Sequence, residues 1–186
     1  LLDEPVDVNA LLRGVREKLA LMTDKSLDIS CDFRSDRHVI RGDPNLLEQA
    51  LLHIALNASE ALEDGGTLSL STERADVDEQ FARARPNISA GSHIAIEIAD
   101  DGPGIPPELR QKVFEPFFTT KDRQENAGIG LAMASGVAKA HMGDLSLDES
   151  DGGARLRLLV PLLAEEPPES DLHQPRQVTA GGAPAQ

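Results

Sequence analysis

The chain has 186 residues, a formal net charge of −14, 40% hydrophobic residues and 27% charged residues, which is the composition of a globular domain. The acidic balance argues against nucleic acid or an anionic membrane surface as a main partner, because both select clustered lysine and arginine. The single cysteine, Cys31, excludes an internal disulfide and a multi-cysteine zinc site. With five Phe, no Trp and no Tyr, the core must consist of Leu, Ile, Val and Ala.

The chain opens on Leu1-Leu2-Asp3 without an initiator Met, and we expect it to come from a longer parent protein. No apolar run reaches the ~18 residues of a membrane span, and no signal peptide opens the chain. We therefore expect a monomeric cytoplasmic domain, whether or not its parent is anchored in a membrane. Residues 1–163 read as one domain, and residues 164–186, rich in Pro, Gly, Glu and Gln, are predicted to be a disordered tail.

Capping signals and periodicity predict the first half of the domain. Asp7 or Asn9 can cap the first helix, and Asp43 followed by Pro44 is typical of the start of the second. Gly65-Gly66 ends that second helix. The expected elements are helices over Val8–Met22 and Asp43–Glu63, and strands over Leu27–Phe33 and Val39–Ile40.

The second half mixes strands, loops and short helices. We expect an antiparallel strand pair first, then a short helix, a long loop over Phe114–Ala127, a second helix and a closing hairpin that turns at Gly152-Gly153. Because strands and helices do not alternate regularly, the sequence predicts an α+β fold, a two-layer sandwich with a mostly antiparallel sheet. The expected elements are strands over Thr67–Thr72, His93–Ala99, Leu145–Leu147 and Ala154–Val160, and helices over Pro107–Val113 and Gly128–His141.

A polar stripe runs along the predicted Asp43–Glu63 helix, formed by Gln49, His53, Asn57 and Glu60. His53 and Asn57 stand one turn apart and therefore point the same way. An amide carbonyl is a good oxygen ligand for Mg²⁺, which takes its other ligands from water and phosphates. The alternative is an ordinary solvated helix face.

The segment Asp100–Ile105 follows a predicted strand directly. Gly102 and Gly104 on either side of Pro103 let the backbone approach a ligand closely. A buried carboxylate at Asp100 would require a donor such as the exocyclic amine of adenine, and would reject the carbonyl of guanine. The alternative is an Asp-Gly turn without a ligand.

Two further segments carry features of a phosphate site. Phe114–Lys121 holds three of the five Phe, which can pin a loop to the body while Thr119, Thr120 and Lys121 face a ligand. Lys121 would supply a cation for phosphate, although a hydrophobic plug over the core is an equal alternative. Gly128 and Gly130 open a helix, whose free amides and dipole favour an anion.

The order of these segments resembles the ATPase domain of histidine kinases, within the superfamily that includes gyrase, Hsp90 and MutL. The similarity covers Val8 to Leu162. The Phe-Glu-Pro-Phe-Phe-Thr-Thr-Lys run is its most specific part and is similar to the nitrogen-regulator and C4-dicarboxylate sensor kinases. The matching segments are Leu46–Leu62 for the N box, Asp100–Gly104 for the G1 box, Phe114–Lys121 for the F box and Gly128–Ala132 for the G2 box.

The resemblance implies a Bergerat fold, in which a mixed five-stranded sheet packs on three helices and ATP binds beneath a lid. It implies that Asn57 and Lys121 are catalytic, that Asn57 binds Mg²⁺ with His53 as a weaker metal ligand, and that Asp100 holds the adenine amine. The remaining nucleotide-binding residues that it implies are Glu60, Ala61, Gly102, Gly104, Ile105, Phe117, Thr120, Gly128, Ile129, Gly130 and Leu131.

The activity implied is that of a protein-histidine kinase in a two-component system. Such a domain transfers the ATP γ-phosphate to a histidine on a separate helical dimerisation domain, for relay to a response-regulator receiver domain. None of the five histidines has the His-Glu/Asp, Arg, Pro context of that acceptor, so we expect the chain alone not to phosphorylate itself.

Two alternatives stay open. One is a degenerate, non-catalytic module that binds partners, because His53, Asn126 and Ala154 stand where the family has Asn, Gly and Thr. The other is a protein-serine kinase acting on an anti-sigma antagonist, against which the Phe-rich run counts.

Overall fold

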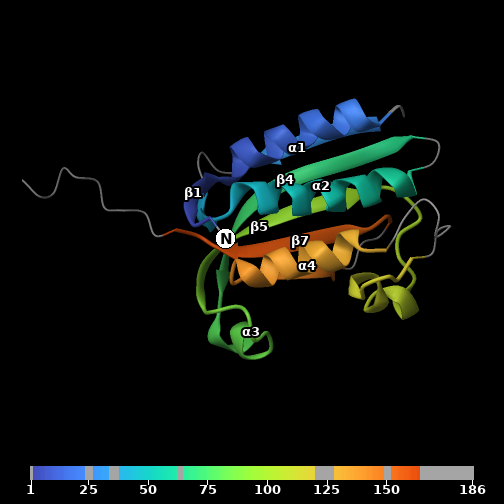
Figure 1. Cartoon of the computed structure of the whole chain (residues 1–186). Coiled ribbons are helices and arrows are strands. Elements are labelled where there is room, and N and C mark those ends of the chain that lie inside the picture. The colour runs from blue at the N-terminus through green and yellow to red at the C-terminus, as the bar shows by residue number, and fades with distance from the viewer. Residues whose placement is uncertain are drawn as a thin grey trace, which may run out of the picture.

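The computed structural model describes residues 2–23, 27–33, 38–62, 65–119, 128–148 and 152–163. These residues form two layers, a five-stranded sheet with helices packed on one face (Figure 1). The covering helices are α1 (Val8–Met22), α2 (Pro44–Ala61) and α4 (Gly130–Ala140). The strands of the sheet are β2 (Leu27–Phe33), β4 (Gly66–Val77), β5 (Gly91–Asp100), β6 (Asp144–Asp148) and β7 (Arg155–Pro161). The predicted α+β sandwich is confirmed.

The sheet has the strand order β2-β4-β5-β7-β6. Only the β2–β4 pair is parallel among the described strands of this sheet, and the other pairs are antiparallel. A separate antiparallel pair joins β1 (Glu4–Asp7) to β3 (Val39–Gly42). The register places Leu68 opposite Asp100, so that β5 ends beside the beginning of β4.

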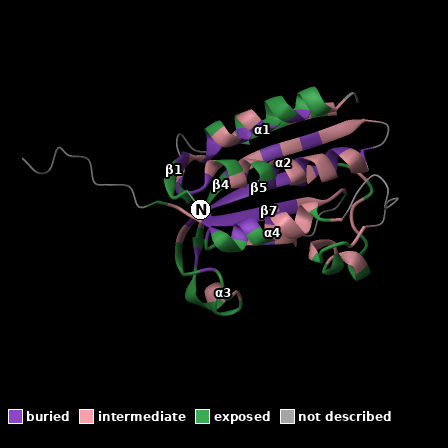
Figure 2. Cartoon of the chain, viewed as in Figure 1, coloured by how far each residue is buried: buried purple, intermediate pink, exposed green. Residues whose placement is uncertain are grey.

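The core lies between the helices and the inner face of the sheet (Figure 2). Alternate residues of each central strand point into it, as the period of two requires. Its fully buried large side chains are all Leu or Ile, which confirms the aliphatic core expected from the scarcity of aromatics. They are Leu12, Leu19, Ile40, Leu47, Leu51, Ile54, Leu68, Leu70, Ile94, Ile96, Ile98 and Leu158. Burying each such side chain contributes roughly 1.5–3 kcal/mol.

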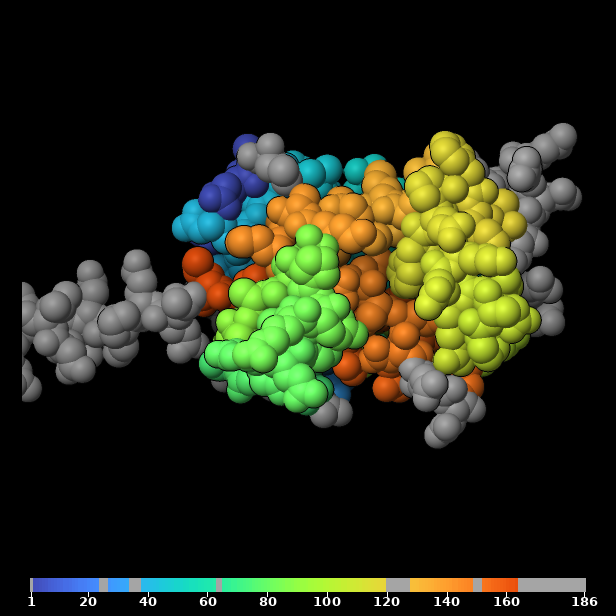
Figure 3. Space-filling model, turned by 90° about the horizontal axis from the view of Figure 1, so that it is seen from below, coloured from blue at the N-terminus to red at the C-terminus, as the bar shows by residue number. Residues whose placement is uncertain are grey.

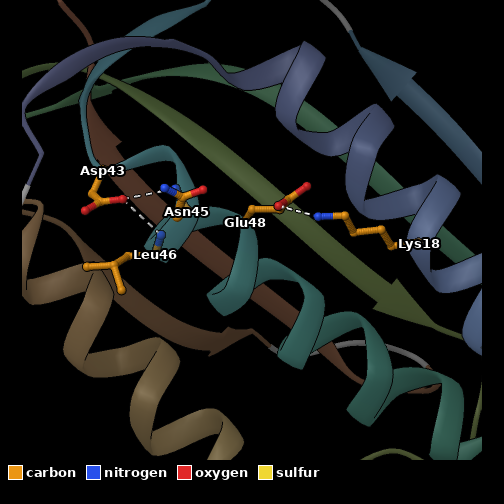
Figure 4. Close-up of polar contacts among 5 residues, drawn as sticks. All are labelled: Lys18, Asp43, Asn45, Leu46 and Glu48. Carbon is orange, nitrogen blue, oxygen red and sulfur yellow. Dashed lines mark hydrogen bonds and ion pairs between the residues drawn. The ribbon is translucent and has the colours of Figure 1, made fainter.

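The start of α2 is fixed by the predicted cap. The Asp43 carboxylate accepts hydrogen bonds from the backbone N–H groups of Asn45 at 3.0 Å and Leu46 at 3.3 Å (Figure 4). With the Leu2 N–H as the largest cause, these bonds hold the pKa of Asp43 below its ordinary value. An ion pair between Lys18 and Glu48 joins α1 to α2 nearby (Figure 4).

Several element predictions need correction. The expected helix over Pro107–Val113 is wrong, because the segment forms two 3₁₀ turns, η1 (Pro107–Leu109) and η2 (Lys112–Phe114). The helix expected to begin at Gly128 begins at Gly130, since Gly128 has a φ of +64° that cannot continue a helix. The segment between β4 and β5 contains a short helix that was not expected, α3 (Glu79–Arg83).

The limits of the two long helices agree closely with the sequence analysis. The first helix has the predicted limits, and Asp7 is its cap. The second ends at Ala61 rather than Glu63. No helix in the described ranges has both the length and the apolar character needed to cross a membrane. The predicted tail over residues 164–186 lies outside the described residues.

Candidate nucleotide-binding site

The N-terminus of α4 faces the polar stripe of α2. A Cβ atom placed on Gly130 would lie 3.4 Å from His53 Nδ1 and 3.6 Å from Asn57 Nδ2. Both side chains are partly exposed, and neither forms a hydrogen bond with another described residue. Ile129, at the N-cap position, provides no side-chain cap. The uncapped N-terminus of α4 therefore lies beside two polar side chains of α2 that are able to bind a ligand.

Asp100 is the last residue of β5 and is only 8% exposed. Its Oδ1 accepts hydrogen bonds from the backbone N–H groups of Gly102 at 3.0 Å and Ala154 at 3.2 Å. Burial raises the pKa of Asp100, outweighing the lowering effect of these two bonds. Its Oδ2 has no hydrogen-bond partner among the described residues. A buried carboxylate with one oxygen that accepts no hydrogen bond favours a ligand that carries a hydrogen-bond donor, such as an exocyclic amine.

The loop after Asp100 is attached to both layers. Asp101 Oδ1 accepts a hydrogen bond from the Thr67 backbone N–H at 2.8 Å, and this bond lowers the pKa of Asp101. Gly102 lies against the end of α2, since a Cβ atom there would be 3.5 Å from the Ala61 carbonyl oxygen. Gly104 has a φ of +74°, where an L residue would be strained. These contacts hold the loop close to the C-terminal turn of α2.

The Phe-rich segment lies at the same end of the sandwich as the Asp100 loop. Phe114 packs against the main core, whereas Phe117 is 71% exposed and has a φ of +69°. The Phe117 backbone N–H donates to the Gly128 carbonyl at 2.9 Å. This bond joins the Phe-rich segment to the residues just before α4. Thr120 and Lys121 lie outside the described residues, so their roles toward phosphate stay predictions. The alternative in which these Phe residues form a hydrophobic plug over the core therefore fits Phe114 and not Phe117.

The structure brings the predicted residues together along α2. His53 and Asn57 face Gly130, and Ala61 lies one turn further on beside Gly102. From residue 53 to residue 61 the helix rises about 12 Å. The base and phosphate halves of the predicted site are therefore neighbours at one end of the sandwich (Figure 1). Of the other predicted residues, Glu60, Ile105 and Leu131 are partly buried and Ile129 is 45% exposed.

Some residues that shape this region were not singled out in the sequence. Leu62 lies against both Gly66 and Gly102, and Gly153 approaches the Asp100 backbone so closely that no Cβ atom fits. The glycine pair at the hairpin turn was a signal for Gly153. Nothing in the sequence distinguished Leu62 from the other core leucines.

His141 connects α2 with the end of α4. Its Nδ1–H donates to the Val137 carbonyl at 2.7 Å, and its Nε2 accepts from the Asp43 backbone N–H at 2.9 Å, an assignment that follows from the two partners. The ring is 4% exposed and packs against Gly42. This arrangement supports a structural role rather than a role as phosphate acceptor.

A hollow of about 230 Å³ lies on the outer face of the sheet, beside α3. None of the predicted nucleotide-binding residues contributes to it. Seen from below, α3 and the segment 101–119 form separate protrusions, in green and yellow, with the orange part of the chain between them (Figure 3). The hollow is lined by Glu73–Asp78, Phe81, Ala95, Arg157 and Leu159, and it is separate from the site at the end of α2.

Comparison of the sequence with known proteins finds sensor kinases as relatives. The chain is 30% identical to Sensor kinase CckA of Brucella abortus over 88% of its length and 17% of that protein. It is also 30% identical to Sensory histidine kinase/phosphatase NtrB of Rhodobacter capsulatus, over 88% of the chain and 45% of that protein. The chain thus spans less than half of either relative.

Solved structures and family models agree with these relatives. The fold is similar to that of full-length ShkA in complex with AMPPNP, with a TM-score of 0.68 and 28% identity over 87% of the chain and 32% of ShkA. The model of the histidine kinase-, DNA gyrase B-, and HSP90-like ATPase family matches residues 42–164, a segment that contains α2, the Asp100 loop and α4. The chain belongs to this ATPase family, and its similarity to the ATP-binding domains of sensor histidine kinases is confirmed.

Proposed function

We propose that the domain binds Mg-ATP along α2, with adenine at Asp100 and the phosphates at the N-terminus of α4. The observation that carries the proposal is the alignment of a buried carboxylate with one unbonded oxygen and an uncapped helix N-terminus, both beside one helix. ShkA, which has the same fold, was solved with the ATP analogue AMPPNP. Family membership and geometry therefore support the same ligand.

The further step is phosphoryl transfer to a histidine on a separate helical dimerisation domain, followed by relay to a receiver domain. Transfer of this kind depends on positioning and on neutralising charge, rather than on covalent chemistry by the protein. Asn57 would hold Mg²⁺, which neutralises phosphate charge when bound. The amides at Gly130 would orient the phosphates, and Asp100 would fix the base. The relatives named sensor kinases support this step, and the chain alone is expected to bind ATP without phosphorylating itself.

The binding half is tested by calorimetry with Mg-ATP and Mg-GTP. In Asp100→Asn, the side-chain NH₂ group would face the exocyclic amine of adenine, so that two donors meet. The variant also loses a hydrogen bond to a charged group, which contributes about 1.5–3 kcal/mol. We expect the Kd for ATP to rise by about 10- to 150-fold. Asp101→Asn is the matched control, because its amide oxygen still accepts from the Thr67 N–H. Equal affinity of wild type and Asp100→Asn for ATP, or equal affinity of wild type for ATP and GTP, contradicts the adenine assignment.

The transfer half requires the parent's helical domain. Mixing it with this domain and labelled ATP should label one histidine of the helical domain, and an absence of label excludes kinase activity under those conditions. A non-catalytic module is the second candidate, favoured by the imidazole of His53 at the metal position and by the missing hydroxyl at Ala154. It predicts a complex with a receiver domain that forms without nucleotide, together with no nucleotide binding at all.

A further inference from the structure

The metal position of the proposed site contains an imidazole. His53 precedes Asn57 by one turn of α2, and both side chains approach the same point, the start of α4 at Gly130. Neither is engaged by another described side chain, so both are available to a ligand placed there. No group of three or more His, Cys, Asp or Glu in the described residues could hold a metal by itself. A metal in this position would therefore depend on the nucleotide phosphates and on these two side chains.

These two side chains differ in what they offer a metal. The Asn57 amide can turn to present its oxygen, and an amide oxygen with phosphates and water suits Mg²⁺ well. The ring nitrogens of His53 do not suit Mg²⁺, because imidazole is a softer ligand that first-row transition ions bind better. Mn²⁺ accepts the same oxygen ligands as Mg²⁺ and tolerates a nitrogen ligand in addition.

We infer that His53 makes this domain select a transition ion such as Mn²⁺ over Mg²⁺ as the metal bound with ATP. This inference rests on the proposed nucleotide site and adds a preference to it. His53 acts as a direct ligand to the nucleotide-bound metal, and Asn57 supplies the oxygen that either metal accepts.

The charged groups near His53 are compatible with its proposed role as a metal ligand. On α2, the next titratable group of the stripe is Glu60, which is partly exposed and lies beyond Asn57. The N-terminal turn of α4, Gly130–Met133, carries no titratable side chain, so the imidazole is the distinctive ligand at this position. Gln49, one turn before His53 and exposed, provides a control on the same helix face.

The test measures ATP binding by calorimetry in Mg²⁺ and in Mn²⁺ for wild type, His53→Asn and Gln49→Asn. We expect the Kd of wild type to be about tenfold lower in Mn²⁺ than in Mg²⁺. In His53→Asn an amide oxygen replaces the ring, so the two metals should become nearly equivalent. Gln49→Asn should behave as wild type, and circular dichroism checks that each variant is folded.

A second readout does not depend on affinity. Pulsed EPR of the Mn²⁺–ATP complex should show a nitrogen coupling from imidazole in wild type and Gln49→Asn, and this coupling should be lost in His53→Asn. Tight ATP binding with the same metal ratio in wild type and His53→Asn, or the same nitrogen signal in both, overturns the metal preference and leaves the proposed function intact. Absence of ATP binding by folded wild type in either metal overturns both.

Discussion

Replacing His141 with Ala tests how α2 and α4 are held together. The imidazole accepts a hydrogen bond from the Asp43 N–H and donates one to the Val137 carbonyl, and it is almost fully buried. Asp43 caps the helix that carries His53 and Asn57. His141 therefore fixes the start of α2 against the end of α4, the helix whose other end is proposed to hold phosphate.

The cost follows from what the substitution leaves behind. The buried Asp43 N–H loses its acceptor, which costs about 1–3 kcal/mol. Removal of the ring also leaves a cavity beside Gly42 and removes the bond to Val137. Together these effects should lower the free energy of unfolding by roughly 3–5 kcal/mol. At about 2–4 °C per kcal/mol for a chain of this size, Tm should fall by about 6–20 °C.

Thermal and urea unfolding followed by circular dichroism measure this change. Lys139→Ala is the control, because Lys139 is exposed on the last turn of the same helix and its loss should change stability by less than about 0.5 kcal/mol. At a temperature where the variant is folded, His141→Ala should also weaken ATP binding, since the two helices are no longer aligned. A loss of stability no greater than that of Lys139→Ala would refute the bridging role.

Three further substitutions test other parts of the structure. Gly136→Ala, in the middle of α4 with nothing within 4 Å of the added Cβ, should raise stability by about 0.5–1 kcal/mol in urea unfolding. Gly143→Ala should lower it by about 3 kcal/mol or more, because the Cβ overlaps the rigid Leu159 carbonyl oxygen. Because burial raises the pKa of Asp100 in the folded state, the folded protein retains its proton longer and stability falls as pH rises through that pKa. Asp100→Asn should therefore stabilise the ligand-free protein at neutral pH, with a gain that shrinks toward acidic pH in unfolding at several pH values.

Local signals in the sequence were sufficient for the two long helices, α1 and α2. Asp43-Pro44 predicted the start of α2 because it combines a side-chain acceptor with a residue that needs no amide partner, and the apolar spacing of α1 predicted its full extent. By contrast, Pro107–Val113 forms two 3₁₀ turns, since a segment this short gains little from helical hydrogen bonds unless it packs along one face. The five-residue α3 was missed because it is too short to show a helical period in the sequence.

The outer parts of β4 and β5 were also missed. The predicted strands stopped at Thr72 and began at His93, but the observed strands pair out to Val77 and Gly91. The added residues of β4 are largely polar and exposed, so no hydrophobic pattern marked them. They are stabilised by a small second core around Phe81, which packs with Val77, Ile88, Ala95 and Leu159. Contacts between residues so distant in sequence leave no local signal.

The site itself was predicted from the order of its segments, and its convergence depends on tertiary contacts. The Asp100 loop is positioned by the sheet, through the N–H of Ala154, the residue before β7, and the N–H of Thr67 in β4. The His53–Asn57 pair is positioned by helices, through packing of α2 on α4 and the bridge at His141.

The direct contacts of the two halves involve different residues, so we expect a substitution in one half to have little effect on the other. Substitutions that alter the sheet-bound loop should change the choice of base while leaving the metal dependence as it was. Substitutions on the helix pair should change the metal and phosphate contacts while leaving discrimination between ATP and GTP intact. On this basis, we expect a substitution of His53 to change which ion accompanies the nucleotide and to leave the proposed adenine contact at Asp100 as it was.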